Sequence, residues 1–484
     1  MYFKFVFVWL ALLVITSGTT SCTTTRNDEK IPVTTSSPEA RELYMKGLAF
    51  ADKLRPKDAL VYFQQAVEKD SNFALAYLGM ANNAQGPVDF FKYIVKAESL
   101  GAKVSEGERL LISFARLGTT GEIGKQTAVA EKLVTMFPKD ERAHDLRGRN
   151  YQFRERKLDK SIEEYKKAIA INPTYSTPYN WMGYAYSGLE QYNDAENAFK
   201  KYIELIPDDP NPYDSYAEIL MKEGKFDASI ENYQKAIDLQ SGFINSYLGI
   251  ACDYIFKKEY SMAMDELEKM YQVAKNDGER RLALFGKTLC YVDQNMGDEA
   301  VKELEKSYAV AERANDAGNM ATDCFNMGLV LLSQNKTEQA QKKFDQGSKI
   351  SEASGLSNGV KKLIHRGYLF NSAQAAIQKH AREDAVSKIE EFTKEAKAID
   401  NDFQLKGTGQ LKGMLALSEK SFDSAVSELQ GSNLQDPYNL YLLSQAYEGK
   451  GEKKKAKEMY DKALNFNAFA NINQVLVRSM GKKE

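Results

Sequence analysis

The chain has 484 residues, and its 65 Lys and Arg side chains nearly balance its 67 Asp and Glu, so the formal net charge is −2. No net positive field favours nucleic acid or an anionic membrane surface, so a partner must be recognised by shape and local charge. Proline is scarce at 11 residues, whereas Tyr and Phe number 27 and 24. This composition favours long helices with aromatic side chains packed between them.

The first 22 residues have the pattern of an export signal. Lys4 precedes an apolar run over residues 5–15, and small or hydroxyl residues lead from there to Cys22. The run is too short for a comfortable membrane span, which needs about 20 apolar residues. The placement of Cys22 resembles the bacterial lipobox, with Thr19 at the position that is usually aliphatic. The resemblance implies that Cys22 is lipidated; a plain secretory signal and an uncleaved anchor are the alternatives.

Residues 23–39 are rich in Thr, Ser and Pro and have no apolar periodicity. Such a segment is predicted to be a flexible tether between the lipid and the folded part.

The rest of the chain repeats with a period of about 34 residues. The clearest unit covers residues 176–209, in which Gly183 belongs to a first helix and Ala195 and Phe199 lie on one stripe of a second. Gly183 removes a side chain where the two helices would press together, and Pro207 ends the second helix. The unit is therefore predicted to be a hairpin of two amphipathic helices.

These residues resemble the tetratricopeptide repeat, and the resemblance recurs. Comparable units begin at Ala40, Glu141, Pro210, Ala321, Lys406 and Pro437, and more degenerate ones begin near Asn72, Gly107, Ile244, Arg281 and Val360. The unit from Glu141 has one extra residue between its helices. The resemblance implies an all-α solenoid of about twelve hairpins, stacked as a right-handed superhelix with a concave groove.

We divide the array into an N-terminal part, 40–277, and a C-terminal part with longer helices, 278–470. In segments such as 269–281 and 306–320 we expect the second helix to extend beyond the 34-residue frame. Residues 471–484 are expected to form a capping helix or tail.

Catalytic chemistry has little support in the sequence. His144, His365 and His380 show no metal-ligand spacing on one helix, and we expect each to be a partly exposed surface residue without a role. Nucleophile-elbow and phosphate-loop motifs do not occur. We therefore expect no enzyme activity, no cofactor and no metal.

The four cysteines do not have zinc-site spacing either. Apart from Cys22 they are Cys252, Cys290 and Cys324, which lie in helical patterns and are expected to be buried free thiols. One disulfide among these three remains an alternative in an oxidising compartment.

In tetratricopeptide domains, ligand contacts come mainly from the first helix of each repeat, at fixed positions facing the groove. In the three most regular units the resemblance assigns these positions to Arg142, Asp145, Arg149, Thr177, Asn180, Tyr184, Asn211, Asp214 and Glu218. An ordinary solvated polar face is the alternative interpretation.

The resulting hypothesis is a protein-interaction scaffold that is lipid-anchored in the bacterial cell envelope, at the outer membrane, facing the periplasm or the surface. Proteins or peptides would bind in the concave groove, the membrane would be contacted only through the N-terminal lipid, and nucleic acid would not bind. The alternative is a lipoprotein that binds a glycan or peptide solute and works with an outer-membrane transporter. Nearly continuous repeats and a single Trp after the signal, Trp181, disfavour it.

Overall fold

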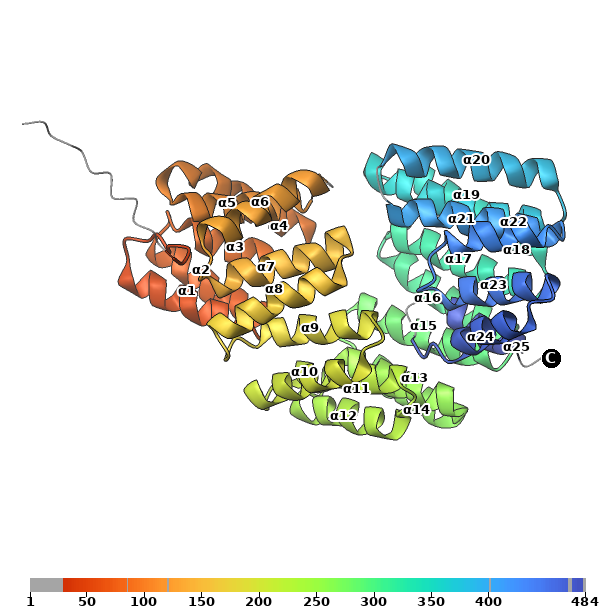
Figure 1. Ribbon diagram of the computed structural model, residues 1–484, viewed down its shortest axis with the longest axis horizontal. Coiled ribbons are helices and arrows are strands. Elements are labelled where there is room, and N and C mark those ends of the chain that lie inside the picture. The colour runs from red at the N-terminus through yellow and green to blue at the C-terminus, as the bar shows by residue number, and fades with distance from the viewer. Residues whose placement is uncertain (1–28, 85, 120–121, 400–401, 469–471, 482–484) are drawn as a thin grey trace, which may run out of the picture.

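The computed structural model describes residues 29–84, 86–119, 122–399, 402–468 and 472–481 (Figure 1). Within these ranges every regular element is helical, which confirms the all-α prediction. Helices α1 to α24 pair in chain order into twelve hairpins, and α25 follows the last of them. This number agrees with the repeat count expected from the sequence. No helix in the described part is both long enough and apolar enough to cross a membrane.

The helices of the first six hairpins are α1 (Pro38–Ala51), α2 (Pro56–Lys69), α3 (Ala74–Asn82), α4 (Pro87–Ser99), α5 (Glu106–Leu117), α6 (Ile123–Met136), α7 (Glu141–Asn150), α8 (Leu158–Ile171), α9 (Thr177–Gly188), α10 (Tyr192–Leu205), α11 (Pro210–Lys222) and α12 (Phe226–Leu239). The remaining helices are α13 (Ile244–Lys257), α14 (Tyr260–Val273), α15 (Asp277–Asp293), α16 (Gly297–Arg313), α17 (Ala317–Ser333), α18 (Thr337–Ala353), α19 (Asn358–Gln378), α20 (Arg382–Ala398), α21 (Asp402–Ser418), α22 (Phe422–Gln430), α23 (Pro437–Gly449), α24 (Lys453–Leu464) and α25 (Asn473–Gly481).

Glycine and aromatic side chains set the close packing within the hairpins. A Cβ built on Gly183 would lie 2.6 Å from the ring of Phe199, which is fully buried. The same relation holds between Gly148 and the ring of Tyr165, at 2.5 Å. No real Cβ fits at such distances, so glycine is required where the second helix inserts its ring against the first.

The extra residue in the unit from Glu141 is accommodated locally. After α7 the chain makes a π-helical turn over Tyr151–Glu155, followed by Arg156 in the left-handed region with φ of 57°. Such a turn takes up one more residue than an α-helical turn. It leaves the ring of Phe153 44% exposed, edge-on to Trp181 with 5.4 Å between centroids.

The later hairpins are longer, but not only in their second helices. α15 and α17 each have 17 residues and α19 has 21. In segment 269–281 the second helix, α14, stops at Val273, and it is α15 that begins early. The reason is Asn276, whose side chain accepts a hydrogen bond from the backbone N–H of Glu279 and so caps α15.

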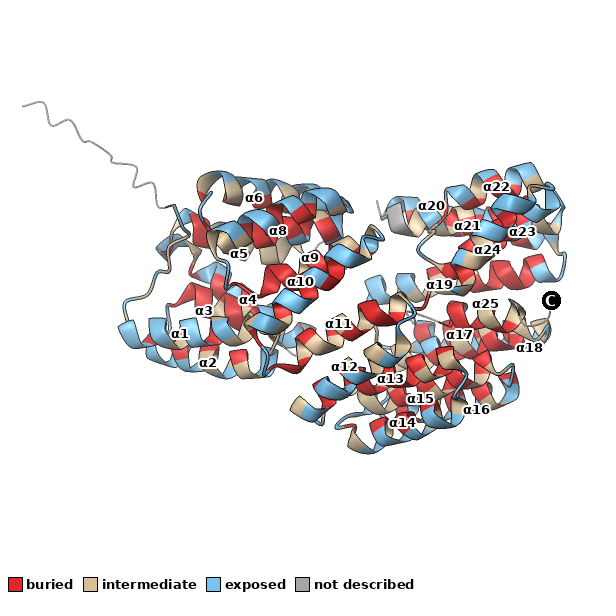
Figure 2. Cartoon of the chain, turned by 60° about the horizontal axis from the view of Figure 1, so that its bottom comes forward, coloured by how far each residue is buried: buried red, intermediate tan, exposed pale blue. Residues whose placement is uncertain are grey.

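The superhelix folds back on itself, so that its last helices lie beside α15 (Figure 1). α25 covers α23 and α24, as a cap would, and it also packs against α15. Ile472, just before α25, and Val475 and Leu476 within it join a large buried cluster. This cluster extends from α11 to α17 and so crosses the boundary drawn between the two arrays at 277/278. The C-terminal segment therefore also closes the array. Along the array, the helices carry buried residues where they pack on one another and exposed residues on their outer sides (Figure 2).

Residues 29–37 depart from the expected flexible tether. The carboxylate of Glu108 accepts hydrogen bonds from the backbone N–H and the hydroxyl of Thr34, at 2.8 and 2.7 Å. The Thr35 hydroxyl donates to Asp70 Oδ2 at 2.6 Å, and the N–H of Ile31 donates to Asp140 at 2.9 Å. Buried helix-end carboxylates thus find their donors in this segment, which explains why a Thr/Ser-rich stretch is held against the array.

Candidate functional site

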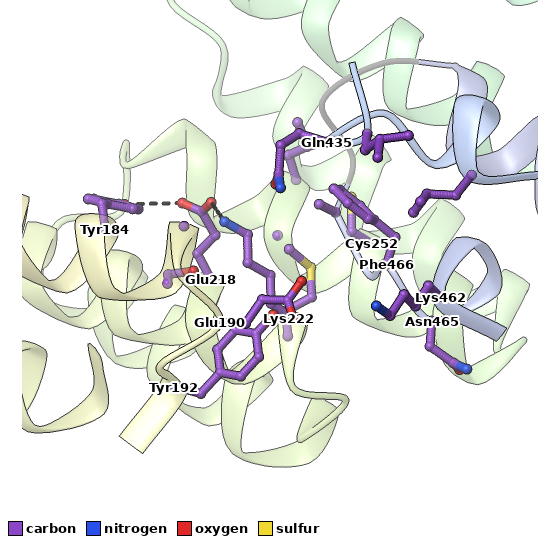
Figure 3. A pocket seen from close by; sticks show the side chains of 18 of the residues that line it. Tyr184, Glu190, Tyr192, Glu218, Lys222, Cys252, Gln435, Lys462, Asn465 and Phe466 are labelled. Carbon is purple, nitrogen blue, oxygen red and sulfur yellow. Dashed lines mark hydrogen bonds and ion pairs between the residues drawn. The ribbon is translucent and has the colours of Figure 1, made fainter. Parts of the chain in front are cut away.

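A cavity of about 1010 Å³ lies where the superhelix folds back. One wall is made by the first helices of three consecutive hairpins, α9, α11 and α13. The opposite wall comes from α23, α24 and the segments flanking that hairpin, including Gln435 and Phe466. Figure 3 shows Tyr184 and Glu218 on one side and Lys462, Asn465 and Phe466 on the other. The concave face is therefore not an open groove here, because the chain itself covers it.

The wall from α9, α11 and α13 carries polar groups that are held by contacts with one another. The hydroxyl of Tyr184 donates to Glu218 Oε2 at 3.1 Å, and Lys222 Nζ lies 3.1 Å from Glu218 Oε1 (Figure 3). The hydroxyl of Ser246 donates to Asp214 Oδ1 at 2.6 Å. These contacts hold the side chains in defined positions, so the wall can present hydrogen-bonding groups to a ligand without first reorganising.

Burial raises the pKa of two of these groups. It raises the pKa of Asp214 to about 7, against the hydrogen bond from Ser246 and with a further contribution from the nearby Glu218 carboxylate. Burial also raises the pKa of the Tyr184 hydroxyl well above its ordinary value. Near neutral pH, Asp214 is thus present in both protonation states, and Tyr184 remains a hydrogen-bond donor.

The opposite wall is mainly apolar. Leu434, Leu440, Met459 and Phe466 line it, with Gln435 and Asn465 between them. Its charged residues are engaged elsewhere: Lys462 lies 3.4 Å from Glu458, and Asp461 lies 2.9 Å from Lys457. A ligand in the cavity would meet hydrogen-bonding groups on one side and apolar surface on the other.

The cysteine in the cavity is not a reactive nucleophile. This residue, Cys252, is 2% exposed, and burial raises the pKa of its thiol well above the ordinary value. A thiol kept protonated is a weak nucleophile. Among the described residues, the cavity lining contains no histidine.

Three of the nine predicted groove residues, Tyr184, Asp214 and Glu218, line this cavity. Asn211, on the same helix as Asp214, does not; its side-chain oxygen accepts a hydrogen bond from the buried Tyr202 hydroxyl at 3.3 Å. Asn180 is 2% exposed and likewise lies outside the lining. First helices of the repeats do line the cavity, but burial by neighbouring elements decides which of their positions a ligand can reach.

The groove positions in the unit from Glu141 are occupied by the first hairpin instead. The guanidinium of Arg142 donates twice to the carboxylate of Asp52, at 2.8 and 2.6 Å. The Thr177 hydroxyl donates to the backbone carbonyl of Asp52 at 2.9 Å. Asp52 follows directly after α1, so the turn of the first hairpin fills the space that the frame assigned to a ligand.

Asp145 and Arg149 form an ion pair with each other at 3.0 Å. Asp145 is 1% exposed and also accepts a hydrogen bond from Tyr175 at 3.3 Å, so it is part of the core. Only the Arg149 side chain, 44% exposed, remains open to a partner. The far wall of the cavity was not predictable from the repeat pattern, because nothing in that pattern indicates that residues 434–468 face residues 184–252.

The structure also shows the surroundings of the cysteine and histidine side chains that lie in its described part. Cys252, Cys290 and Cys324 are buried free thiols, as expected, and no disulfide joins them. His144 is not at the surface: it is 7% exposed, with Nδ1 2.6 Å from Glu164 Oε2 and Nε2 3.0 Å from the carbonyl of Pro138. Burial lowers its pKa, but the hydrogen bond with Glu164 outweighs this and the net shift is upward. Cys22 lies outside the described residues.

Two sequence relatives show how far the likeness extends. Anaphase-promoting complex subunit 3 of Schizosaccharomyces pombe is 25% identical over 192 residues, which are 39% of this chain and 27% of that protein. Hsp70-Hsp90 organizing protein 2 of Arabidopsis thaliana is 24% identical over 323 residues, 64% of this chain and 53% of that protein. The match thus spans between about a quarter and about half of the length of these relatives.

Among solved structures, a tetratricopeptide repeat protein from Parabacteroides merdae is 18% identical and covers 57% of this chain and 94% of its own, with a TM-score of 0.35. MamA is 23% identical and covers 34% of this chain and 95% of its own, with a TM-score of 0.29.

Family models match most of the helices that build the cavity. The model described as TPR repeat matches residues 153–189, and the model described as tetratricopeptide repeat matches 177–209, 211–243 and 437–468. The first three segments contain α9 and nearly all of α11, and the last contains α23 and α24, so most of each wall is repeat surface, whereas α13 lies outside the matches. The chain is therefore a solenoid that contains tetratricopeptide repeats, and its cavity lies between repeats from two distant parts of the sequence.

Proposed function

We propose that this protein is a non-catalytic interaction scaffold that holds a segment of a partner protein in the cavity between α9–α13 and α23–α24. The observation that carries the proposal is the pairing of a polar, positioned wall with an apolar one across a volume of about 1010 Å³. This is at the upper end of the usual range for ligand pockets, about 300–1,000 Å³. An extended peptide offers backbone groups to Tyr184, Asp214 and Glu218 and side chains to the apolar wall.

The comparisons support this proposal. Relatives matched by the chain include proteins named as a subunit of the anaphase-promoting complex, as an Hsp70-Hsp90 organizing protein and as a DnaJ homolog. The repeats themselves are surfaces that proteins of this family use for protein partners. The same comparisons do not favour a solute-binding partner of a transporter.

Site-specific photo-crosslinking in living cells tests the proposal. Asn245 lines the cavity and is exposed, whereas Glu231 is exposed on the outer helix α12. A photoreactive amino acid at position 245 should give a defined adduct with a partner protein, and the same group at position 231 should not. A photoreactive amino acid at position 435, on the far wall, should give an adduct with the same partner. The bulky substitution Asn245→Trp should abolish this second adduct, whereas Glu231→Trp should leave it unchanged. Equal adducts from both faces would refute the cavity as the binding site.

We further propose that the scaffold is anchored in the bacterial cell envelope through a lipid on Cys22. The support is the apolar run and small residues that precede this cysteine. Because residues 29–37 are held against the array, at most residues 23–28 separate the lipid from the folded part, a reach of about 20 Å when extended. Fatty-acid labelling should mark the wild type but not Cys22→Ser, and equal labelling of the two would refute the anchor.

A further inference from the structure

We propose a binding site for a divalent transition-metal ion between helices α19 and α20, and Zn²⁺ is the ion that suits it best. His365 on α19 faces Glu391 and Glu395 on α20. His365 Nε2 lies 3.6 Å from Glu391 Oε1 and 3.7 Å from Glu395 Oε1, and one potential ligand atom from each residue lies within 4.8 Å of the other two. The site is separate from the cavity and does not rest on the proposed function.

The geometry of the three groups suits a metal ion. The two glutamates are one turn apart on α20 and so project from the same face of that helix. Zn–N and Zn–O bonds of about 2.0–2.2 Å place ligand atoms roughly 3.3 Å apart in a tetrahedral site. His365 Nε2 thus needs to approach each glutamate oxygen by only about 0.3–0.4 Å, and the two glutamate oxygens already lie within 4.8 Å of each other, so rotation of the partly exposed side chains can complete the site. The ligands are partly exposed, so water can complete the coordination.

The donor set distinguishes among cations. One imidazole nitrogen with two carboxylate oxygens suits Zn²⁺ and its first-row neighbours, whereas Mg²⁺ and Ca²⁺ prefer oxygen ligands throughout. The buried thiols of Cys252, Cys290 and Cys324 are on other helices and take no part.

Neighbouring residues hold two of the ligands in place. Arg366 Nη1 lies 3.9 Å from Glu395 Oε2, and Arg366 Nε donates to Gln404 on α21 at 2.9 Å. This arrangement turns Oε2 of Glu395 towards the arginine and leaves Oε1 for the metal. The ring of Tyr368 stacks on the His365 ring with 6.0 Å between centroids. Such outer contacts orient ligands in metal sites. The arginine charge opposes a cation, and the two carboxylates offset it.

The alternative is that His365 merely forms ion pairs with the glutamates when it is protonated. Surface pairs of this kind are common and contribute little, about 0–1 kcal/mol. The sequence shows no metal-ligand spacing here, because the histidine and the glutamates of the cluster come from two helices. If the cluster binds metal, added Zn²⁺ stabilises the protein. If it forms only ion pairs, added Zn²⁺ has no effect on stability.

The test uses the full chain, stripped of metal with a chelator and then dialysed. Zn²⁺ binding is measured by competition with a chromophoric chelator, and thermal unfolding is followed with and without Zn²⁺. We expect one Zn²⁺ per chain at this site, a rise in melting temperature with Zn²⁺ and none with Mg²⁺. His365→Ala should weaken binding at least tenfold and remove the rise in melting temperature, as should Glu391→Gln with Glu395→Gln.

His380→Ala is the matched control, because His380 lies in the turn of the same hairpin, outside the cluster. It should bind Zn²⁺ as the wild type does, and circular dichroism should show unchanged helicity for every variant. Zn²⁺ binding that is absent from the wild type, or equally strong in His365→Ala, would overturn the proposal.

Discussion

Breaking the contact that closes the superhelix should release α25 without unfolding the hairpins. Arg478 Nε donates to Asp293 Oδ1 at 2.8 Å, and its Nη2 lies 3.5 and 3.4 Å from the carbonyl oxygens of Ile255 and Phe256 at the end of α13. Asp293 is fully buried, and the Arg478 side chain is 13% exposed. Arg478→Ala therefore removes the cationic partner of a buried carboxylate.

The magnitude follows from the burial of the pair. Removing one partner of a buried ion pair costs about 3–5 kcal/mol. Asp293 keeps the hydrogen bond from the Tyr260 hydroxyl, at 2.8 Å, so we take the lower end, about 3 kcal/mol. This free energy belongs to the docking of α25 on α13 and α15, and it corresponds to a factor of roughly 150 in the opening equilibrium.

Hydrogen exchange followed by mass spectrometry measures this opening directly. Peptides covering residues 473–481 and the end of α13 should exchange roughly a hundredfold faster in Arg478→Ala, and those from α1–α8 should not change. Lys457→Ala is the control: its pair with Asp461 lies on α24, with side chains 76% and 49% exposed, so its loss should have almost no effect. Equal protection of α25 in Arg478→Ala and wild type would show that apolar contacts alone close the superhelix.

Further predictions concern packing and pH. Gly183→Ala should lower the free energy of unfolding by about 1–3 kcal/mol in urea denaturation, because the new methyl group meets the Phe199 ring at 2.6 Å. Gly124→Ala, whose Cβ would contact nothing within 4 Å, should not destabilise the protein, and equal losses from both would refute the packing argument. The pKa of Asp214 is raised to about 7 from 3.8, so its contribution to stability is present at low pH and lost as the pH rises through 7. Asp214→Asn, which can still accept the hydrogen bond from Ser246, should gain stability relative to wild type between pH 5 and pH 8; a constant difference would contradict the shift.

Local features of the fold were predictable because they depend on neighbours in the sequence. Apolar periodicity places Phe199 on the buried stripe of α10, and the repeat frame pairs it with Gly183 one helix earlier. The same frame predicted twelve hairpins and placed Tyr184, Asp214 and Glu218 on inner helices. It could not predict that Asn276 would begin α15 early, because capping depends on a side-chain hydrogen bond and not on apolar spacing.

The path of the superhelix was not predictable, because small rotations between successive hairpins accumulate over the whole array. Their sum decides that Arg142 meets Asp52, 90 residues away, and that Arg478 meets Asp293, 185 residues away. It likewise decides that the first hairpin fills one part of the groove and that the last hairpin covers another. The amino-acid sequence by itself thus determined which helices form and which faces they bury. Only the tertiary structure decided where the concave surface stays open to a partner, since that depends on distant packing that no local pattern encodes.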